Sequence, residues 1–179
     1  MGDMSAPFRV VLVCLGNICR SPMAEAVLRD RVAAAGLAGR VTVESAGTAD
    51  YHVGSGADSR ALAALEARGY DGSEHRARQF RRDWFTRADL VLALDDDNLA
   101  ALVALDPGAA ARGGLRLLRS YDPHAVREGD LEVPDPYYGG PDGFRHVLDL
   151  VERAADGLVA ELARTVGDGA AEGSARHGG

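Results

Sequence analysis

The chain has 179 residues, 46% of them hydrophobic and 26% charged, which is the length and composition of one ordinary globular domain. Its formal net charge of −7 argues against a general nucleic-acid binder, and its two cysteines cannot form a disulfide framework or a cysteine-rich zinc site. All 20 basic residues are arginines, which excludes the lysine of P-loop nucleotide-binding motifs and every lysine Schiff-base mechanism.

The N-terminal part of the chain alternates between strand and helix patterns. The run at 8–13 is short, apolar and rich in β-branched residues, which is typical of a buried strand. Ser21 is the N-cap candidate of a helix that ends at Gly36, and a second strand at 40–45 and a second helix at 57–68 follow. The apolar stripe of the first helix is expected to hold Met23, Ala26, Val27 and either Ala33 or Ala34.

The C-terminal part continues the alternation and ends in a long helix. A strand at 89–94 leads into three aspartates and a helix that reaches Leu105, and a short strand follows at 115–118. The segment 120–142 is rich in Pro, Gly and Asp, so we expect it to be loop-like. The apolar face of the last helix comprises Phe144, Val147, Leu148, Val151, Ala155, Leu158, Val159 and Leu162.

This order of elements predicts an α/β fold. Strands that alternate with helices form parallel βαβ units, so we expect a three-layer sandwich: a four-stranded parallel sheet with helices on both faces. We assign residues 1–165 to a single domain and expect residues 166–179 to be a disordered tail. In such a sheet, ligands bind at the carboxyl ends of the strands.

The loop after the first strand has the sequence features of an anion-binding site. Cys14 ends the strand, Gly16 and Asn17 allow a tight loop, and a helix begins directly after Arg20. Amide groups of such a loop and the positive end of the helix form a cradle for an anion, in which Arg20 supplies a bidentate grip. The same positive surroundings favour the thiolate of Cys14, the form that attacks phosphorus. The plainer alternative is a buried cysteine that ends a core strand beside a surface arginine.

A second segment, Asp135-Pro136-Tyr137-Tyr138-Gly139-Gly140, extends this pattern. Together, a C-x5-R-S loop near the N-terminus and a late D-P-Y element closely resemble low-molecular-weight protein tyrosine phosphatases. The resemblance runs from about Phe8 to Leu162, and the doubled tyrosine is more similar to the eukaryotic-like subgroup than to the bacterial enzymes paired with exopolysaccharide kinases. It includes Glu44-Ser45-Ala46-Gly47-Thr48, Tyr51-His52-Val53-Gly54 and His75-Arg76-Ala77-Arg78-Gln79.

The resemblance implies a role for each residue of the first loop. Cys14 is the nucleophile that forms a phosphocysteine, and Arg20 clamps the transferring phosphoryl group. Ser21 hydrogen-bonds the sulfur of Cys14, while Ser45 and His75 support the loop. Asn17 holds the loop, in a left-handed backbone conformation that asparagine tolerates. The substrate-binding amides belong to Leu15, Gly16, Asn17, Ile18, Cys19 and Arg20.

The resemblance also implies an acid and an aromatic binding site. Asp135 protonates the leaving phenolate and then deprotonates the attacking water. Tyr51 and Tyr137 are the aromatic walls around a phenyl ring, and Tyr138 is a further substrate-binding residue. No metal or other cofactor is implied, because Arg20 and the loop amides supply the charge stabilisation.

Several of these assignments have a structural alternative. Asp122 also precedes a proline, so it is either a turn residue or the true acid. His75 fits a core-edge histidine, and Tyr138 fits a packing residue. Cys19 is either a small buried residue under the loop or a partner that captures oxidised Cys14 as a disulfide. The aspartates at 95–97 are most simply solvated acids at a helix start.

Three other functions fit parts of the sequence. An arsenate reductase of the same fold also uses C-x5-R, but the thioredoxin-linked enzymes need further cysteines, and none follows Cys19. A magnesium-dependent haloacid-dehalogenase phosphatase fits the aspartates at 95–97 but also needs a lysine. A phosphotyrosine-binding module without activity would lack the nucleophile or the acid, and this chain has both.

The expected partners are phosphotyrosine-containing proteins, with no nucleic acid and no membrane. No apolar run approaches the ~18 residues that span a bilayer, and Met1 to Pro7 lack the layout of a signal peptide. We therefore expect a cytoplasmic monomer.

Overall fold

The centre of the computed structural model, which describes residues 6–175 and the side chains of residues 6–167, is a parallel β-sheet. β1 pairs with β2 along its whole length, from Phe8 beside Val41 to Cys14 beside Gly47. The predicted four-stranded parallel sheet is thereby confirmed. Its strands are β1 (Phe8–Cys14), β2 (Val41–Gly47), β3 (Leu90–Ala93) and β4 (Leu115–Leu117), in the order β2-β1-β3-β4.

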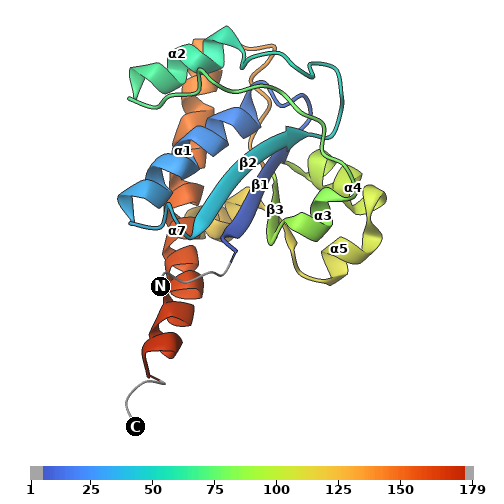
Figure 1. Ribbon diagram of the computed structural model, residues 1–179. Helices are drawn as coiled ribbons and strands as arrows, with labels where there is room; N and C mark the ends of the chain where they lie inside the picture. The colour runs from blue at the N-terminus through green and yellow to red at the C-terminus, as the bar shows by residue number, and fades with distance from the viewer. Residues whose placement is uncertain (1–5, 176–179) are drawn as a thin grey trace.

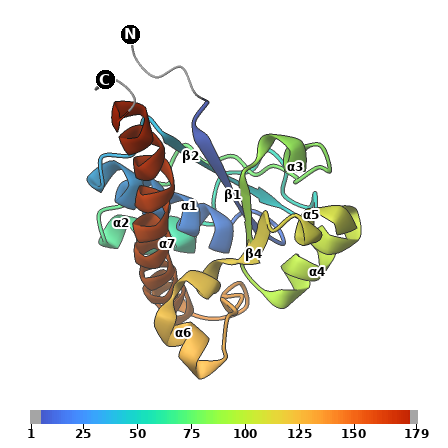
Figure 2. The ribbon, with the colours of Figure 1, turned by 90° about the horizontal axis from the view of Figure 1, so that it is seen from below.

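Helices cover both faces of the sheet and complete the predicted three-layer sandwich (Figure 1). α1 (Arg20–Ala34) and α7 (Pro141–Ala175) cover one face, and α2 (Ser59–Ala67) packs beside them (Figure 2). The opposite face carries α3 (Trp84–Arg87), α4 (Asp96–Leu105) and α5 (Pro107–Ala111). Within the described residues, no helix has both the length and the apolar character that crossing a bilayer requires.

The sheet is buried on both faces, and each face has its own apolar core. Val10 and Leu12 belong to the core under α1 and α7, whereas Val11 and Val13 belong to the core under α4. Successive side chains of a strand point to opposite faces, so a continuous apolar run is what a doubly covered strand needs. Phe144 of α7 is among the largest fully buried side chains of the first core.

The start of α1 differs from the prediction. The helix begins at Arg20, with Cys19 at the N-cap position and no side-chain capping bond, so Ser21 is not the cap. The hydroxyl of Ser21 lies within the loop that precedes the helix, where it has other partners. Ala33 and Ala34 are exposed, and the buried apolar side chains of the helix are Met23, Ala24, Val27, Leu28 and Val32.

The segment 120–142 is less loop-like than expected, because it contains the end of a 3-10 turn, η1 (Leu118–Tyr121), and a short helix, α6 (Pro123–Glu128). Asp122 caps α6 by accepting a hydrogen bond from the amide of His124, and Gly129 ends the helix at a φ of 73°. Asp122 and Gly129 therefore cap the two ends of one short helix, and Pro123 occupies its first position.

The C-terminal helix is longer than the sequence pattern predicts. α7 continues to Ala175, so residues 166–175 are helical where a disordered tail was expected, and residues 176–179 lie outside the described residues. Adding residues to an existing helix avoids the cost of nucleation, which is why a helix can extend past its apolar stripe.

The strand order places the carboxyl end of β1 at a topological switch point. The chain leaves β1 to form β2 on one side, and it later returns to form β3 on the other side. The crevice at such a point is where open α/β sheets bind ligands. In this chain that position is occupied by the loop that starts at Cys14.

The contact between α7 and η1 depends on a glycine. A Cβ atom added at Gly157 would collide with the carbonyl oxygen of Tyr121, whereas one at Gly167 in the same helix would meet nothing within 4 Å. We predict that Gly157→Ala lowers the free energy of unfolding by about 1–3 kcal/mol, because the helix must move away from η1. Gly167→Ala is the matched control and should be neutral or stabilising by up to about 1 kcal/mol. Urea unfolding of both variants measures this, and a stabilised Gly157→Ala protein would contradict the packing described.

Candidate active site

The β1–α1 loop (residues 14–20) is held with its carbonyl groups facing the surrounding chain. Donors from three other segments bind these carbonyls, and within the described part of the chain the amides of residues 15–19 meet no protein acceptor. The amides are therefore free to bind an anion at the centre of the loop. The donor–acceptor pairs are Thr48 N to Cys14 O (2.9 Å), Ala49 N to Leu15 O (3.0 Å), His75 Nε2 to Asn17 O (2.7 Å) and Asp58 N to Ile18 O (2.8 Å).

A glycine at the end of β2 allows this close contact. A Cβ atom on Gly47 would lie 2.6 Å from the carbonyl oxygen of Leu15 and 3.2 Å from the amide nitrogen of Asn17. Both of these atoms are backbone atoms, which cannot rotate away as a side chain can. Only glycine fits between β2 and the loop without moving the loop.

Asn17 fixes the conformation of the loop from within. Its φ of 57° lies in the left-handed region, as expected from the sequence. The side-chain Nδ2 donates to the hydroxyls of Ser21 (2.7 Å) and Ser45 (3.0 Å), and Oδ1 accepts from the amide of Arg78 (2.9 Å). Asn17 is completely buried, so these three bonds satisfy a polar side chain that has no access to water.

The hydroxyl of Ser21 lies 3.1 Å from the sulfur of Cys14. The same hydroxyl accepts from Asn17 Nδ2 (2.7 Å) and lies 3.4 Å from the carbonyl oxygen of Ala46, so its proton has two acceptors within reach, this carbonyl and the sulfur of Cys14. Both side chains are buried, and Cys14 is a free thiol.

Arg20 is a buried cation at the mouth of the loop, with 3% of its surface exposed. Its Nη1 donates to Asp95 Oδ2 (2.5 Å) and to the carbonyl of Val133 (3.0 Å). Both protons of Nη1 are thus used, and the edge formed by Nε and Nη2 remains available for two oxygens of a ligand. Burial lowers the pKa of Arg20, but attraction by Cys14, Asp95 and Asp135 outweighs it and raises this pKa overall, so the guanidinium stays charged.

The role of Asp95 was missed in the sequence. Asp96 and Asp97 are exposed, in agreement with the expectation of solvated acids, but Asp95 binds Arg20 and also caps α4 by accepting from the amide of Asn98 (2.7 Å). The correction has a physical reason: β3 lies next to β1, so the acid that follows β3 meets the arginine that follows β1. The sequence did contain a signal for this pairing: Asp95 directly follows a predicted parallel strand, and residues at that end of neighbouring strands lie close together.

The two candidate acids have different surroundings. Asp135 lines the same pocket as Cys14, its Oδ2 is 3.7 Å from Nη2 of Arg20, and its side chain is 44% exposed. Asp122 is buried, caps α6, and lies 3.5 Å from Nε of Arg153. The sequence alone leaves both open, whereas the structure brings only Asp135 to the pocket.

Aromatic side chains surround the entrance of this pocket, whose volume is about 220 Å³. Tyr51, Tyr137 and Tyr138 all line it; Tyr51 is 73% exposed and Tyr138 is 95% exposed. The rings of Tyr137 and Tyr138 pack edge to face, with centroids 5.0 Å apart. His52 also lines the pocket and is a residue to which the sequence assigned no individual role.

Cys19 lies in the wall of the same pocket and is buried. Burial is the main cause that raises the pKa of its thiol to about 12, and the negative charges of Asp58, Cys14 and Asp135 add to the effect. Cys19 is therefore a neutral thiol at physiological pH. Its burial fits the interpretation of Cys19 as a small buried residue. Its position in the wall of the pocket that contains Cys14 leaves the second interpretation, a disulfide partner of Cys14, open.

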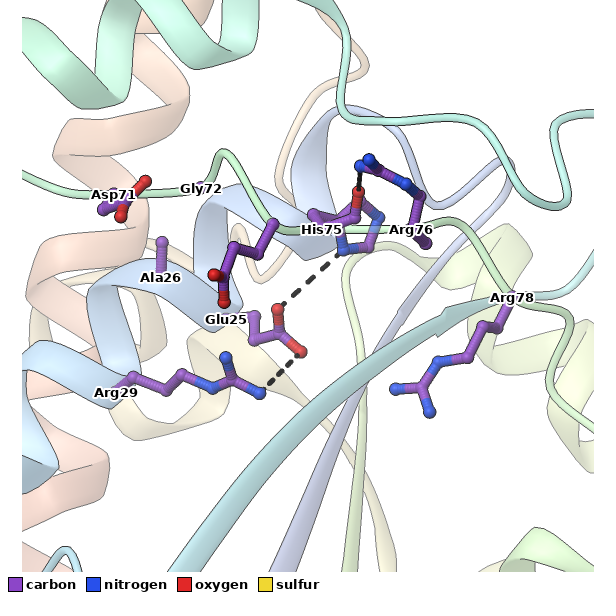
Figure 3. A pocket seen from close by; sticks show the side chains of 9 residues that line it. Glu25, Ala26, Arg29, Asp71, Gly72, His75, Arg76 and Arg78 are labelled. Carbon is purple, nitrogen blue, oxygen red and sulfur yellow. Dashed lines mark hydrogen bonds and ion pairs between the residues drawn. The ribbon is translucent and has the colours of Figure 1, made fainter.

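A second cavity, of about 460 Å³, lies on the other side of His75 (Figure 3). His75 has a 5% exposed side chain, and its Nδ1 is 3.9 Å from a carboxylate oxygen of Glu25. Since Nε2 of the same ring donates to Asn17, His75 joins this cavity wall to the β1–α1 loop. The sequence suggested either a histidine at the edge of the core or a support of the loop. The side chain of His75 is buried and also contacts the loop, so it fits both interpretations.

Comparison with known proteins agrees with this geometry. Residues 9–167 match the family described as "Low molecular weight phosphotyrosine protein phosphatase". A protein of Streptomyces coelicolor named "Low molecular weight protein-tyrosine-phosphatase" is 56% identical over 159 residues, which are 89% of this chain and 96% of that protein.

Solved structures are also similar. The protein tyrosine phosphatase of Entamoeba histolytica, solved with Hepes in its active site, is 35% identical and has a TM-score of 0.82; 88% of this chain and 98% of that chain are covered. Wzb of Vibrio vulnificus, solved in complex with benzylphosphonate, is 28% identical and has a TM-score of 0.74, with 87% and 99% covered. From its sequence, its fold and the loop that begins at Cys14, the chain belongs to the low-molecular-weight protein-tyrosine-phosphatase family.

Proposed function

We propose that the chain hydrolyses phosphotyrosine in proteins through a phosphocysteine on Cys14, with Asp135 as general acid and base and without a metal ion. One observation carries the proposal. A single pocket of about 220 Å³ is lined by the sulfur-bearing Cys14, by the loop with free amides, by Arg20 and by Asp135. A nucleophile, an anion cradle and a proton donor in one pocket are the parts that phosphoryl transfer needs.

The cradle stabilises the transferring phosphoryl group. Its charge is spread over three equatorial oxygens, which the amides of residues 15–19 and the Nε–Nη2 edge of Arg20 can bind together. The N-terminal end of α1, which starts at Arg20, adds a positive partial charge. These groups are held in place before substrate binds, so little reorganisation is needed during the reaction.

In the first step, the thiolate of Cys14 attacks phosphorus. The S–P bond forms as the bond between phosphorus and the tyrosyl oxygen breaks, and protonated Asp135 gives its proton to the leaving oxygen. The hydroxyl of Ser21, 3.1 Å from the sulfur, stabilises the thiolate before this attack.

In the second step, water hydrolyses the phosphocysteine. Asp135, now a carboxylate, takes a proton from the water as its oxygen bonds to phosphorus. The S–P bond breaks, inorganic phosphate is released, and Cys14 returns to the thiolate that Ser21 stabilises. The half-exposed position of Asp135 fits both contacts, because the group must meet first the leaving oxygen and then a water molecule.

The depth of the pocket favours phosphotyrosine. Cys14 is 3% exposed, so the phosphoryl group must be carried down to it on a long, narrow side chain. A phenyl ring bound between Tyr51 and Tyr137 gains roughly 0.5–1.5 kcal/mol for each aromatic pair beyond the buried area. The benzylphosphonate bound by Wzb of Vibrio vulnificus is an aromatic phosphonate of this shape.

The proposal also covers the oligomeric state of the protein and the cellular compartment in which it acts. We also propose a monomer as the active form: Cys14, Arg20 and Asp135 of one chain already line one pocket, so the proposed chemistry needs no residue from a second copy. Both cysteines are free, and a reducing compartment such as the cytoplasm keeps a thiolate nucleophile in this state. The cysteine content also does not favour an arsenate reductase, since no cysteine follows Cys19.

The first test compares substrates. We predict hydrolysis of p-nitrophenyl phosphate and of phosphotyrosine peptides in the presence of EDTA, with phosphoserine peptides of the same sequence hydrolysed much more slowly, because serine is too short to reach Cys14. Cys14→Ser should abolish turnover and still bind vanadate, since the amides and Arg20 remain. Equal rates on the two kinds of peptide would contradict the role of pocket depth.

The second test distinguishes the two aspartates. A general acid contributes about 10²- to 10⁴-fold, so Asp135→Asn should lower the first step on phenyl phosphate by that factor. The loss should shrink on 2,4-dinitrophenyl phosphate, whose leaving group departs without a proton. Asp122→Asn is the matched control and should cost little in rate, because asparagine also caps a helix. A leaving-group-dependent defect in Asp122→Asn and not in Asp135→Asn would show the assignment to be wrong.

The third test concerns oxidation. Peroxide converts Cys14 to a sulfenic acid. The sulfur of Cys19 can then attack the sulfur of Cys14, its proton leaving with the hydroxide as water, and the disulfide that forms protects Cys14 from further oxidation. We predict that dithiothreitol restores most of the activity of the wild type and less of the activity of Cys19→Ser. Mass spectrometry of the tryptic peptide that contains both cysteines should show the loss of two hydrogens. Equal recovery of the two proteins would contradict this role of Cys19.

A further inference from the structure

A side chain outside the chemical steps joins the two loops of the site. Arg60, in the first turn of α2, donates from Nε to Asp58 Oδ1 (3.0 Å) and from Nη2 to Asp58 Oδ2 (2.9 Å). Its Nη1 donates to the carbonyls of Tyr137 (2.9 Å) and Gly139 (3.4 Å). One guanidinium thus binds a carboxylate on one side and the backbone around Tyr137 on the other.

The same guanidinium also lies over two aromatic rings. Its central carbon is 5.4 Å from the ring centroid of Tyr137 and 4.8 Å from that of Phe144. Phe144 is fully buried at the start of α7, so it provides a fixed surface. Planar stacking and forked hydrogen bonding together are contacts that arginine can make and lysine cannot.

Asp58 connects this arginine to the β1–α1 loop. The amide of Asp58 donates to the carbonyl of Ile18 (2.8 Å), and its carboxylate caps α2 by accepting from the amide of Arg60 (2.8 Å). The side chain of Asp58 is 12% exposed, and the hydrogen bond from Arg60 is the main cause that lowers the pKa of its carboxyl group. Asp58 therefore remains a charged partner for Arg60 over the physiological pH range.

On the other side, the peptide groups of Tyr137 connect Arg60 to the candidate acid. The amide of Tyr137 donates to Asp135 Oδ1 (3.1 Å), while its carbonyl accepts from Arg60. Upstream, Val133 is held by the carbonyl of Leu94 (2.8 Å) and by Arg20 (3.0 Å). Asp135 thus lies between an anchor at Val133 and an anchor at Arg60.

We propose that Asp58 and Arg60 are positioning residues that hold the segment 135–139 against the β1–α1 loop and thereby set the approach of the Asp135 carboxyl group to the leaving oxygen. This inference rests on the proposed role of Asp135. A general acid must come within about 2.6–3.2 Å of the oxygen that it protonates, and a misplacement of about 1 Å can cost 10²-fold. Neither Asp58 nor Arg60 needs to touch the substrate for this effect.

The test measures turnover of Arg60→Met and Arg60→Lys on two substrates that differ in their need for an acid. Met keeps part of the apolar stem, and Lys keeps the charge without the fork. We expect kcat/KM, which reports the first step and excludes the hydrolysis of phosphocysteine that both substrates share, to fall about ten- to a hundredfold on phenyl phosphate and less than about threefold on 2,4-dinitrophenyl phosphate. In an Asp135→Asn background, Arg60→Met should have no further effect on phenyl phosphate, because the group that it positions is absent.

Arg68→Met is the matched control. Arg68 follows the end of the same helix and joins it to α7 through Asp149 and Glu152, away from the segment 135–139. Removing it should leave both rates unchanged, which separates loss of the α2–α7 contact from loss of positioning. Thermal unfolding confirms that each variant is folded, and Arg60→Lys provides the readout if Arg60→Met does not fold.

The possible outcomes are distinct. An equal loss on both substrates, or an undiminished loss in the Asp135→Asn background, would overturn the positioning role while leaving the proposed function intact. If Asp135→Asn alone shows no dependence on the leaving group, the proposed role of Asp135 fails, and this inference fails with it. A loss confined to phenyl phosphate and absent from the double variant supports the inference.

Discussion

The direction of the peptide groups between Cys14 and Arg20 is the constraint on which the rest of the site depends. Carbonyls carry negative partial charge, so an anion can bind here only if each of them turns away from the centre of the loop. Donors from the segments at 48–49, 58 and 75 bind these carbonyls, and Gly47 permits the close approach of β2 to the loop. The anion cradle is therefore built as much by these outer segments as by the loop itself.

The charges of the site are balanced around one buried cation. A buried arginine without a partner is costly, and Asp95 provides that partner at 2.5 Å while it leaves one edge of the guanidinium available for a ligand. Asp135, at 3.7 Å, is a looser partner on a more exposed segment. This difference fits separate tasks: Asp95 fixes the cation, and the looser contact leaves Asp135 able to serve as the proposed acid.

The fold and the centre of the site could be predicted from the sequence because both depend on local patterns. Apolar β-branched runs predicted the strands of the sheet, and the spacing from Cys14 to Arg20 predicted the loop after β1. The pairing of Arg20 with Asp95 and that of Arg60 with the carbonyl of Tyr137 join residues 75 and 77 positions apart. No local pattern marks such pairs, since they depend on which strands and helices become neighbours.

Helix capping also depends on tertiary contacts that the local sequence does not reveal. Asp122 and Asp135 both precede a proline, yet one caps a short helix and the other faces the pocket. The sequence offers Ser21 as a cap for α1, but Ser21 lies inside the helix, and its hydroxyl contacts Asn17 and Cys14 instead. Where a polar side chain has two possible partners, tertiary contacts decide between them.

The most direct measurement for this account is the location of phosphate on the enzyme during turnover. The enzyme is mixed with p-nitrophenyl phosphate, denatured within milliseconds at neutral pH and digested, and the phosphopeptide is fragmented by mass spectrometry. The account predicts one phosphate on the sulfur of Cys14, formed together with a burst of nitrophenol. Phosphate on Asp95 or Asp135, or a burst with no phosphate bound to the protein, would contradict it.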